Sequence, residues 1–598
     1  MFRYVALLWN CDSPAEAAAT DEIKRKLLCG STPWQAEYDC GGILAYSVGS
    51  RSETYQCLAL SRYGLVFGAL FEKGSAYSAR LIRDEHIASI SRTEGRVLLE
   101  KYWGDYVAVL CISDIHRDKL ILRSPSGIIR CYLMRYRGVN IVCSNVEDVA
   151  DLGLSFTTNW NYVAAELCSA ATMGWEHTGL NEVSAVLPGR CMRLCPSSRA
   201  SAVYWDPVSV AAEPIDDARQ AIDRLRSGIA ASVQAWVSRQ RRALLMLSGG
   251  LDSAVILACI KEMSEKPPVT CLNLYNSDDA GDERAFARVA AESAGLELLE
   301  RARPPHVDLS ALLDLPKSAR PSSNHTDHIM SHAVAMAFAR ELDATAVFSG
   351  QMGDELFCRQ TGLYALIDHM WMEGWTARTL KIASDVSVYG GLPLSRVLFA
   401  GLRYGYLTRP NLLVRLRNPL LSADIPQPFV DSVKLRSLNY RFRYEWLTKR
   451  HEVPIGKLLQ ICAVSSAQAY FTEFGDALDP DWIMPLYTQP VIEIALRLPT
   501  HFHVANGLDR SIERSAFADS IPKQILMRRT KGSTASLREQ ILNANRTFVR
   551  ELLLDGLLAK EGLLNREAVE RALKKGPLNT PPLVQCIKTE AWLQVWAR

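Results

Sequence analysis

Residues 248–253 read Ser-Gly-Gly-Leu-Asp-Ser, and the interpretation of the whole chain starts from them. An apolar run at residues 243–247 precedes them and another at 254–258 follows, an order that predicts a buried strand, a tight turn and a helix. Two adjacent glycines let the backbone turn sharply with its N–H groups pointing outward, and the new helix adds a positive dipole end. A turn of this kind can bind phosphate groups.

The turn differs from the P-loop of kinases and GTPases because no Gly-Lys-Ser/Thr sequence closes it. Asp252 stands among the predicted anion-binding donors, where a carboxylate is useful if it holds Mg²⁺ bound to pyrophosphate. The hexapeptide resembles the signature of ATP pyrophosphatases, enzymes that attach AMP to a carboxylate or carbonyl oxygen and release pyrophosphate. A plain glycine turn in front of a core helix is the alternative.

A second motif repeats this layout further along the chain. Residues 349–357 read Ser-Gly-Gln-Met-Gly-Asp-Glu-Leu-Phe and follow a predicted strand at 345–348. Loops that follow neighbouring parallel strands meet at one edge of a sheet, so Asp252 and Asp354 are predicted to hold one Mg²⁺ with the pyrophosphate. For Asp354 alone, capping of a helix is the alternative.

Toward the C-terminus, residues 509–514 read Asp-Arg-Ser-Ile-Glu-Arg and residues 528–532 read Arg-Arg-Thr-Lys-Gly. Both resemble segments that occur in this order in asparagine synthetase and its relatives, where the lysine points at the reacting acyl-adenylate. The resemblance implies that Lys531 stabilises the tetrahedral intermediate and the departing phosphate; an ordinary surface lysine is the alternative. The predicted site consists of Asp252, Asp354 and Lys531 as catalytic residues, Asp252 and Asp354 as metal ligands, and Met246, Ser248, Gly249, Gly250, Asp252, Ser253, Ser349, Gly350 and Gly353 as ATP-binding residues.

Composition limits the other possibilities. The 598 residues predict at least two domains, and 68 Lys and Arg against 65 Asp and Glu give a net charge of +3 that does not indicate nucleic acid binding. The fifteen cysteines form no CxxC pair, which argues for reduced thiols in a cytoplasmic protein and against a zinc site or a disulfide framework. No apolar run is long enough to span a membrane. Residues 1–9 predict a first strand rather than a signal peptide.

Residues 1–205 are predicted to form a layered β domain, because short alternating runs at 64–71, 106–111, 128–134 and 139–143 are separated by turns. In asparagine synthetase and its relatives a glutamine-hydrolysing (Ntn-type) domain occupies this place and uses a cysteine directly after the initiator Met. This chain has Phe2 there, and Cys11 is too far along to replace it. The resemblance therefore implies a glutaminase-like scaffold that lacks its nucleophile.

That departure narrows the resemblance to members that use an amine already present in the substrate, which are β-lactam synthetases, carbapenam synthetases and lasso-peptide cyclases. The sequence segments 102–108, 124–132 and 179–189 are most similar to segments of the cyclases, although Ser124 and Arg130 depart from the cyclase pattern. The likeness can also reflect ancestry alone.

Residues 206–222 predict a linker, followed by an amphipathic helix at 221–239. Residues 223–598 predict an α/β domain with a doubly wound parallel sheet, in which a strand at 269–275 and a helix at 282–295 follow the first motif. The acidic pair at 282–283 resembles an acidic residue of the family at this place, and a favourable charge at a helix N-terminus explains it equally well.

The general base is not assigned by the sequence. β-Lactam synthetase has a tyrosine, and asparagine synthetase a glutamate, where this chain has Gln351, which cannot accept a proton at neutral pH. The nearby candidates are Asp368, Glu373, Asp385, His325 and His328.

Residues 378–457 predict a basic helical region, with 14 Lys and Arg against 5 acidic residues. A solvated basic face is the default interpretation. The alternative is a docking surface for an acidic peptide or partner protein, and a cluster of Arg441, Arg443, Lys449 and Arg450 would test it.

The resemblance implies a two-step reaction. A side-chain carboxylate of a leader-processed precursor peptide attacks the α-phosphate of ATP, and the peptide's own N-terminal amine then displaces AMP to close a macrolactam ring, as in lasso peptides. A leader peptidase and a leader-recognition protein are the expected partners. A small-molecule β-lactam or amide synthetase is the first alternative, and a non-catalytic scaffold protein is the second.

Overall fold

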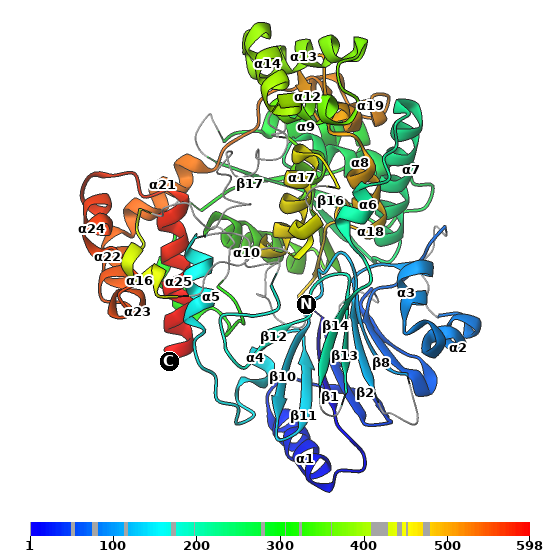
Figure 1. The fold of residues 1–598 in the computed structure, drawn as a ribbon, viewed down its shortest axis with the longest axis vertical. Helices are drawn as coiled ribbons and strands as arrows, with labels where there is room; N and C mark the ends of the chain where they lie inside the picture. The colour runs from blue at the N-terminus through cyan, green and yellow to red at the C-terminus, as the bar shows by residue number, and fades with distance from the viewer. Residues whose placement is uncertain are drawn as a thin grey trace.

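A computed structural model describes residues 2–49, 54–74, 82–112, 118–168, 175–195, 198–276, 281–304, 306–321, 326–359, 362–407, 428–438, 445–449, 452–470 and 479–598 (Figure 1). Within helices and strands, the side chains of a few of these residues are also outside the description, His328 among them.

The N-terminal part contains two antiparallel sheets, each with six strands among the described residues. The strands of the first sheet, in spatial order, are β12 (Ser184–Ala185), β10 (Tyr132–Tyr136), β11 (Val139–Cys143), β1 (Arg3–Leu8), β3 (Ile43–Val48) and β2 (Gln35–Cys40). Those of the second are β14 (Arg199–Val203), β13 (Arg190–Leu194), β9 (Lys119–Arg123), β8 (Tyr106–Cys111), β5 (Gly64–Gly68) and β4 (Gln56–Ala59).

The two sheets pack face to face. Tyr4 of β1 stacks on Phe67 of β5 with ring centroids 4.3 Å apart, and alternate residues of both strands belong to one core. Helix α1 (Pro14–Cys29) packs on the outer face of the first sheet, while α2 (Asp84–Thr93) and α3 (Arg96–Lys101) cover the second. The predicted layered β domain is therefore confirmed, and its strands at 106–111 and 139–143 have the predicted bounds.

The second part is built on a parallel sheet in the order β17 (Leu298–Ala302), β16 (Val269–Tyr275), β15 (Ala243–Met246), β18 (Ala346–Phe348) and β19 (Asp481–Ile483). Helix α10 (Thr326–Glu341) covers one face. Helices α7 (Ala218–Val237), α8 (Leu251–Glu262) and α9 (Arg284–Ala294) pack against the other. The predicted α/β architecture with helices on both faces of a parallel sheet is thus confirmed.

The segment 206–222, predicted as a linker, is partly helical, and the following helix starts before the predicted residue 221. Helix α6 (Pro207–Ala211) lies within it, and α7 already begins at Ala218. Each helix starts at an aspartate whose side chain accepts a backbone N–H, Asp206 for α6 and Asp217 for α7. An aspartate at this position is a strong helix-start signal.

Two groups of helices extend the parallel-sheet part. Helices α12 (Gly362–Met372), α13 (Ala377–Gly390) and α14 (Leu394–Gly401) form one cluster, at the top in Figure 1. The C-terminal helices α21 (Ala535–Ala544), α22 (Arg546–Leu554), α23 (Leu557–Lys560), α24 (Arg566–Lys575) and α25 (Pro581–Ala597) share a core with the first sheet and with α5 (Trp160–Cys168). Figure 1 shows α25 beside α5.

All fifteen cysteines lie within the described residues, and none of them forms a disulfide. Among the helices that the structure describes, none combines the length and the apolar character needed to cross a bilayer.

Candidate active site

The two glycine loops meet at the carboxyl edge of the parallel sheet. Strands β15 and β18 pair in parallel, with Leu245 opposite Phe348, and the loops that follow them lead into α8 and α11 (Gly353–Leu356). β15 is also where the strand order reverses, because β16 and β17 lie on one side of it and β18 and β19 on the other. Ligands of open α/β sheets bind at such a switch point.

Glycine is required where the loops touch. A Cβ added at Gly350 would lie 2.8 Å from the backbone nitrogen of Ser253, and one added at Gly353 would lie 2.3 Å from Asp252 Oδ1. Gly249 has φ +77°, a backbone conformation that residues other than glycine rarely adopt. The predicted glycines therefore let the second loop lie directly against the first.

The serines of the first loop close it internally. Ser248 Oγ accepts a hydrogen bond from the Gly250 N–H at 3.2 Å and lies 3.2 Å from Ser253 Oγ. Ser349 Oγ accepts in the same way from the Gln351 N–H at 3.2 Å. Met246, the remaining predicted ATP-binding residue, ends β15 and is partly buried.

Asp252 and Asp354 converge on one positive group, the guanidinium of Arg510. Arg510 Nη1 donates to both carboxylate oxygens of Asp252, at 2.8 and 3.0 Å, and to Asp354 Oδ1 at 3.0 Å. Lys531 Nζ pairs with the other oxygen of Asp354, and Arg359 Nη1 lies 3.3 Å from the same atom. Two carboxylates from adjacent loops that share one cation are a donor set that fits Mg²⁺.

The two carboxyl groups respond differently to this environment. Burial raises the pKa of Asp252, although Arg510 opposes the shift. Burial also disfavours charge on Asp354, but Lys531 and Arg510 outweigh it, so that its pKa is lowered. Asp354 is therefore the carboxylate that stays charged most readily at this edge.

The loop that carries Lys531 is held by residues of the segments that follow strands β15 and β16. Glu283 Oε1 accepts the Gly532 N–H at 2.9 Å and pairs with Arg528 Nη2 at 2.7 Å. Arg528 in turn donates to the Gly249 carbonyl at 3.1 Å, and Asn276 donates to the Ser533 carbonyl at 3.2 Å. The first glycine loop and the lysine loop are thus tied together through one acidic residue.

This contact resolves the role of the acidic pair at 282–283. Asp282 pairs with Arg284, two residues away, with a shortest separation of 2.6 Å. Glu283 is the member that faces the predicted site. Sequence reasoning left the two equivalent.

Glu513 is a further acidic group of this region that the sequence analysis did not assign. It is fully buried in α19 (Ser511–Ala516), and neither carboxylate oxygen has a hydrogen-bond partner among the described residues. Burial raises its pKa well above the ordinary value, and the charge of Asp252 adds to the shift. Burial therefore favours the neutral form of Glu513.

The residues suggested as general base have other partners. Asp368 is buried and accepts hydrogen bonds from the Gly456 and Lys457 N–H groups and from Thr500 Oγ1. Asp385 accepts a hydrogen bond from the Asn506 N–H, and Glu373 pairs with His369. Gln351, which stands where relatives have a base, accepts a hydrogen bond from Trp482 Nε1. His325 and the side chain of His328 lie outside the described residues.

In the N-terminal domain, Phe2 occupies the place expected for a nucleophile. Its side chain is 8% exposed and stacks on Tyr55, with ring centroids 6.1 Å apart. Tyr55 lies 5.8 Å from the Trp236 ring of α7 and donates to Asp105 at 3.3 Å. Aromatic side chains therefore fill this end of the sheet sandwich, and Cys11 is exposed.

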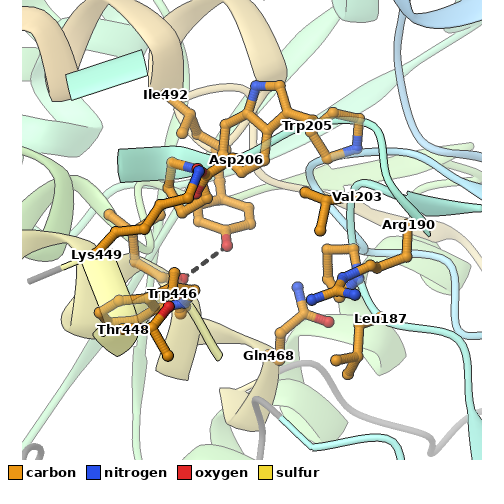
Figure 2. A pocket seen from close by; sticks show the side chains of 16 residues that line it. Leu187, Arg190, Val203, Trp205, Asp206, Trp446, Thr448, Lys449, Gln468 and Ile492 are labelled. Atoms are coloured by element: carbon orange, nitrogen blue, oxygen red, sulfur yellow. Dashed lines mark hydrogen bonds and ion pairs between the residues drawn. The ribbon is translucent and has the colours of Figure 1, made fainter. Parts of the chain in front are cut away.

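A cavity of about 150 Å³ lies between the two parts of the chain (Figure 2). Its lining includes Leu187, Arg190, Trp205, Trp446, Gln468 and Ile492. Its size suits a side chain or a few water molecules rather than a nucleotide.

The basic region 378–457 is described only in part. Arg441, Arg443 and Arg450 of the suggested cluster lie outside the described residues, and Lys449 pairs with Asp206 at 2.6 Å beside the cavity. Lys457, counted as part of a solvated face, is buried: its Nζ donates to Gln460 Oε1 and to the Leu498 carbonyl. The prediction was wrong for this residue.

A protein-family model described as asparagine synthase matches residues 224–459 and 477–597, more than half of the chain. The search of curated protein sequences found no match to this chain. A solved structure described as the allosteric regulatory enzyme of purine biosynthesis is 9% identical, with 51% of this chain and 82% of that one covered and a TM-score of 0.21. The glutamine phosphoribosylpyrophosphate amidotransferase of B. subtilis, complexed with ADP and GMP, is also 9% identical, with 58% and 81% covered and a TM-score of 0.20. TM-scores this low do not inform the fold of the chain.

Proposed function

The chain belongs to the asparagine synthase family, whose members form amide bonds with ATP, and we propose that it closes a macrolactam ring in a lasso-peptide precursor. The observation that carries the ATP-dependent step is the convergence of Asp252 and Asp354 on one cation with Lys531 beside them. The peptide substrate is inferred from the N-terminal sequence segments that resemble lasso-peptide cyclases, and from Phe2, which stands where a glutaminase has its cysteine nucleophile.

In the first step a side-chain carboxylate of the peptide attacks the α-phosphate of ATP, and pyrophosphate leaves. The two glycine loops would bind the phosphates through their N–H groups. Asp252 and Asp354 would hold Mg²⁺, which supplies positive charge to the departing pyrophosphate.

In the second step the N-terminal amine of the same peptide attacks the acyl-adenylate, and AMP leaves as the amide forms. Lys531 would stabilise the oxyanion and the AMP phosphate. Because both reacting groups belong to one chain, their alignment can lower the barrier by up to about 7–11 kcal/mol. Phe2 supports an amine supplied by the peptide rather than ammonia from glutamine.

The test uses purified protein, ATP, Mg²⁺ and synthetic peptides that have a free N-terminal amine and internal Asp or Glu. We expect release of AMP and pyrophosphate and a product lighter than the peptide by one water. An N-acetylated copy of the same peptide is the matched control, because it retains the carboxylate but lacks the nucleophile. The same mass loss from the acetylated peptide, or turnover with small acids and amines but with no peptide, would contradict the proposal.

Two further measurements address the alternatives. Glutamate release from glutamine by the purified protein would show that the N-terminal domain is a working glutaminase. The Cys11→Ser variant should behave like the wild type, because Cys11 is exposed and lies outside the core around Phe2.

A further inference from the structure

Two histidines and one glutamate come together away from the glycine loops. His369 lies in α12, and Glu373 follows one helical turn later, where its N–H donates to the His369 carbonyl at 2.8 Å. Residues four apart share one helix face. His501 belongs to the short helix η8 (Thr500–His503), which is fixed to α12 because Thr500 Oγ1 donates to Asp368 at 2.8 Å.

The three side chains have the spacing of a metal site. Each offers one ligand atom, and these atoms all lie within 4.8 Å of one another. His369 Nδ1 lies 3.3 Å from Glu373 Oε1, and the two imidazole rings are 5.2 Å apart at 74°. Ligands at about 2.0–2.1 Å from a tetrahedral Zn²⁺ are about 3.3 Å apart, so one edge already fits and small side-chain rotations would close the others.

Two imidazole nitrogens of the cluster have no hydrogen bond, within the described part of the chain, that would compete with a cation. His369 Nδ1 and His501 Nε2 are buried and have no hydrogen bond of acceptable geometry among the described residues. The other nitrogen of His369, Nε2, lies 3.1 Å from Thr376 Oγ1 and 3.3 Å from Thr379 Oγ1. Donation of the Nε2 proton to these hydroxyls leaves the Nδ1 lone pair inside the cluster, as in histidines that ligate metals.

Charge supports the same assignment. Arg378 is exposed and opposes a bound cation, whereas the Glu373 carboxylate attracts one. The cluster therefore offers two imidazole nitrogens and one carboxylate oxygen as ligand atoms.

From this geometry we propose that His369, Glu373 and His501 bind a divalent transition metal, with Zn²⁺ as the best match. Two histidines and a glutamate are a known zinc ligand set, and they leave one position for water. The Glu373 side chain is 42% exposed, which gives the metal and that water access. Cysteine spacing could not have revealed this site, because no cysteine takes part.

A metal here would join α12 to the segment that leads toward Arg510. After η8 the chain forms the hairpin β20 (Val504–Ala505) and β21 (Leu508–Asp509), and Arg510 follows. Its guanidinium is the group between Asp252 and Asp354. The proposed site therefore has a structural role, since it would hold the base of the hairpin that presents Arg510.

The experiment measures Zn²⁺ binding to the purified, chelator-treated full chain by competition with a chromophoric chelator. Accessible thiols are first alkylated with iodoacetamide, because Cys11, Cys29 and Cys40 are exposed and could bind zinc themselves. The test variant is Glu373→Gln at the exposed ligand, and the matched control is Glu341→Gln at the exposed end of α10.

We expect the wild type and Glu341→Gln to bind one equivalent of Zn²⁺ equally well, and Glu373→Gln to bind at least about 10-fold more weakly. Co²⁺ should give the intense visible bands of a four-coordinate site without thiolate charge transfer, and Glu373→Gln should lose them. A second variant, His501→Asn, should show the same loss. Equal binding by all four proteins, or no stoichiometric binding by the wild type, would overturn the proposal.

Discussion

The Gly353→Ala substitution tests whether the contact between the two glycine loops controls the catalytic rate. The backbone of Gly353 is outside the left-handed region, so alanine can adopt it. Its Cβ would lie 2.3 Å from Asp252 Oδ1, whereas a non-bonded carbon and oxygen rest about 3.3 Å apart. The Asp252 carboxylate must therefore move by about 1 Å away from its present bonds to Arg510.

A displacement of this size at a reacting centre can lower the rate about 100-fold. The stability effect should be smaller, because overpacking costs about 1–3 kcal/mol and the greater helix propensity of alanine returns up to about 1 kcal/mol. Pyrophosphate release at saturating ATP and peptide measures the rate, and urea unfolding measures the stability.

The matched control is Gly390→Ala at the end of α13, where a Cβ would meet its nearest neighbours at 3.6 Å. That variant should keep full activity. Wild-type turnover in Gly353→Ala, or an equal loss in both variants, would refute the idea that the close approach of the loops positions Asp252.

Four other substitutions test the site and its surroundings. Asp252→Asn and Asp354→Asn should each abolish AMP formation while the protein stays folded, because each removes a metal ligand rather than core volume; full turnover in either would exclude the metal role. Lys531→Ala should lower turnover more than ATP affinity, and the opposite pattern would make Lys531 a ground-state binding residue. Burial lowers the pKa of Lys457 to about 8, so the folded state binds fewer protons than the unfolded state between pH 8 and about 10.5. The stability of the wild type relative to Lys457→Met should therefore rise by up to about 3 kcal/mol over that range in urea unfolding, and a pH-independent difference would show that Lys457 titrates normally.

The local patterns predicted the strands and both glycine loops because their signals lie within a few residues. The strand at 269–275 was predicted with its observed bounds, since an apolar run bounded by turn residues needs no distant contact to be recognised. Gly350 and Gly353 were also predicted, although the reason for them, contact with the first loop, depends on the pairing of β15 with β18.

What the sequence could not show are contacts between distant segments. Arg510 lies 258 positions from Asp252, and only the fold shows that its guanidinium lies between the two aspartates. The basic count over residues 378–457 failed for Lys457 for the same reason, because composition does not distinguish a buried lysine with two acceptors from a solvated one. His369 and His501 likewise become a pair only when α12 packs against η8.

The retention of an N-terminal domain whose expected nucleophile position holds phenylalanine has a physical basis in shared cores. Trp236 of α7 packs on Phe71 with ring centroids 4.9 Å apart, and Gln240 donates to Thr54 at 2.8 Å. The C-terminal helix also contacts this domain, because the Trp592 ring of α25 packs closely on Gly179. A Cβ added at Gly179 would lie 2.5 Å from that ring. Since α7 precedes β15 directly, the contacts of Trp236 and Gln240 stabilise the strand that delivers the first glycine loop. These shared cores give the N-terminal domain a structural role that does not depend on whether it hydrolyses glutamine.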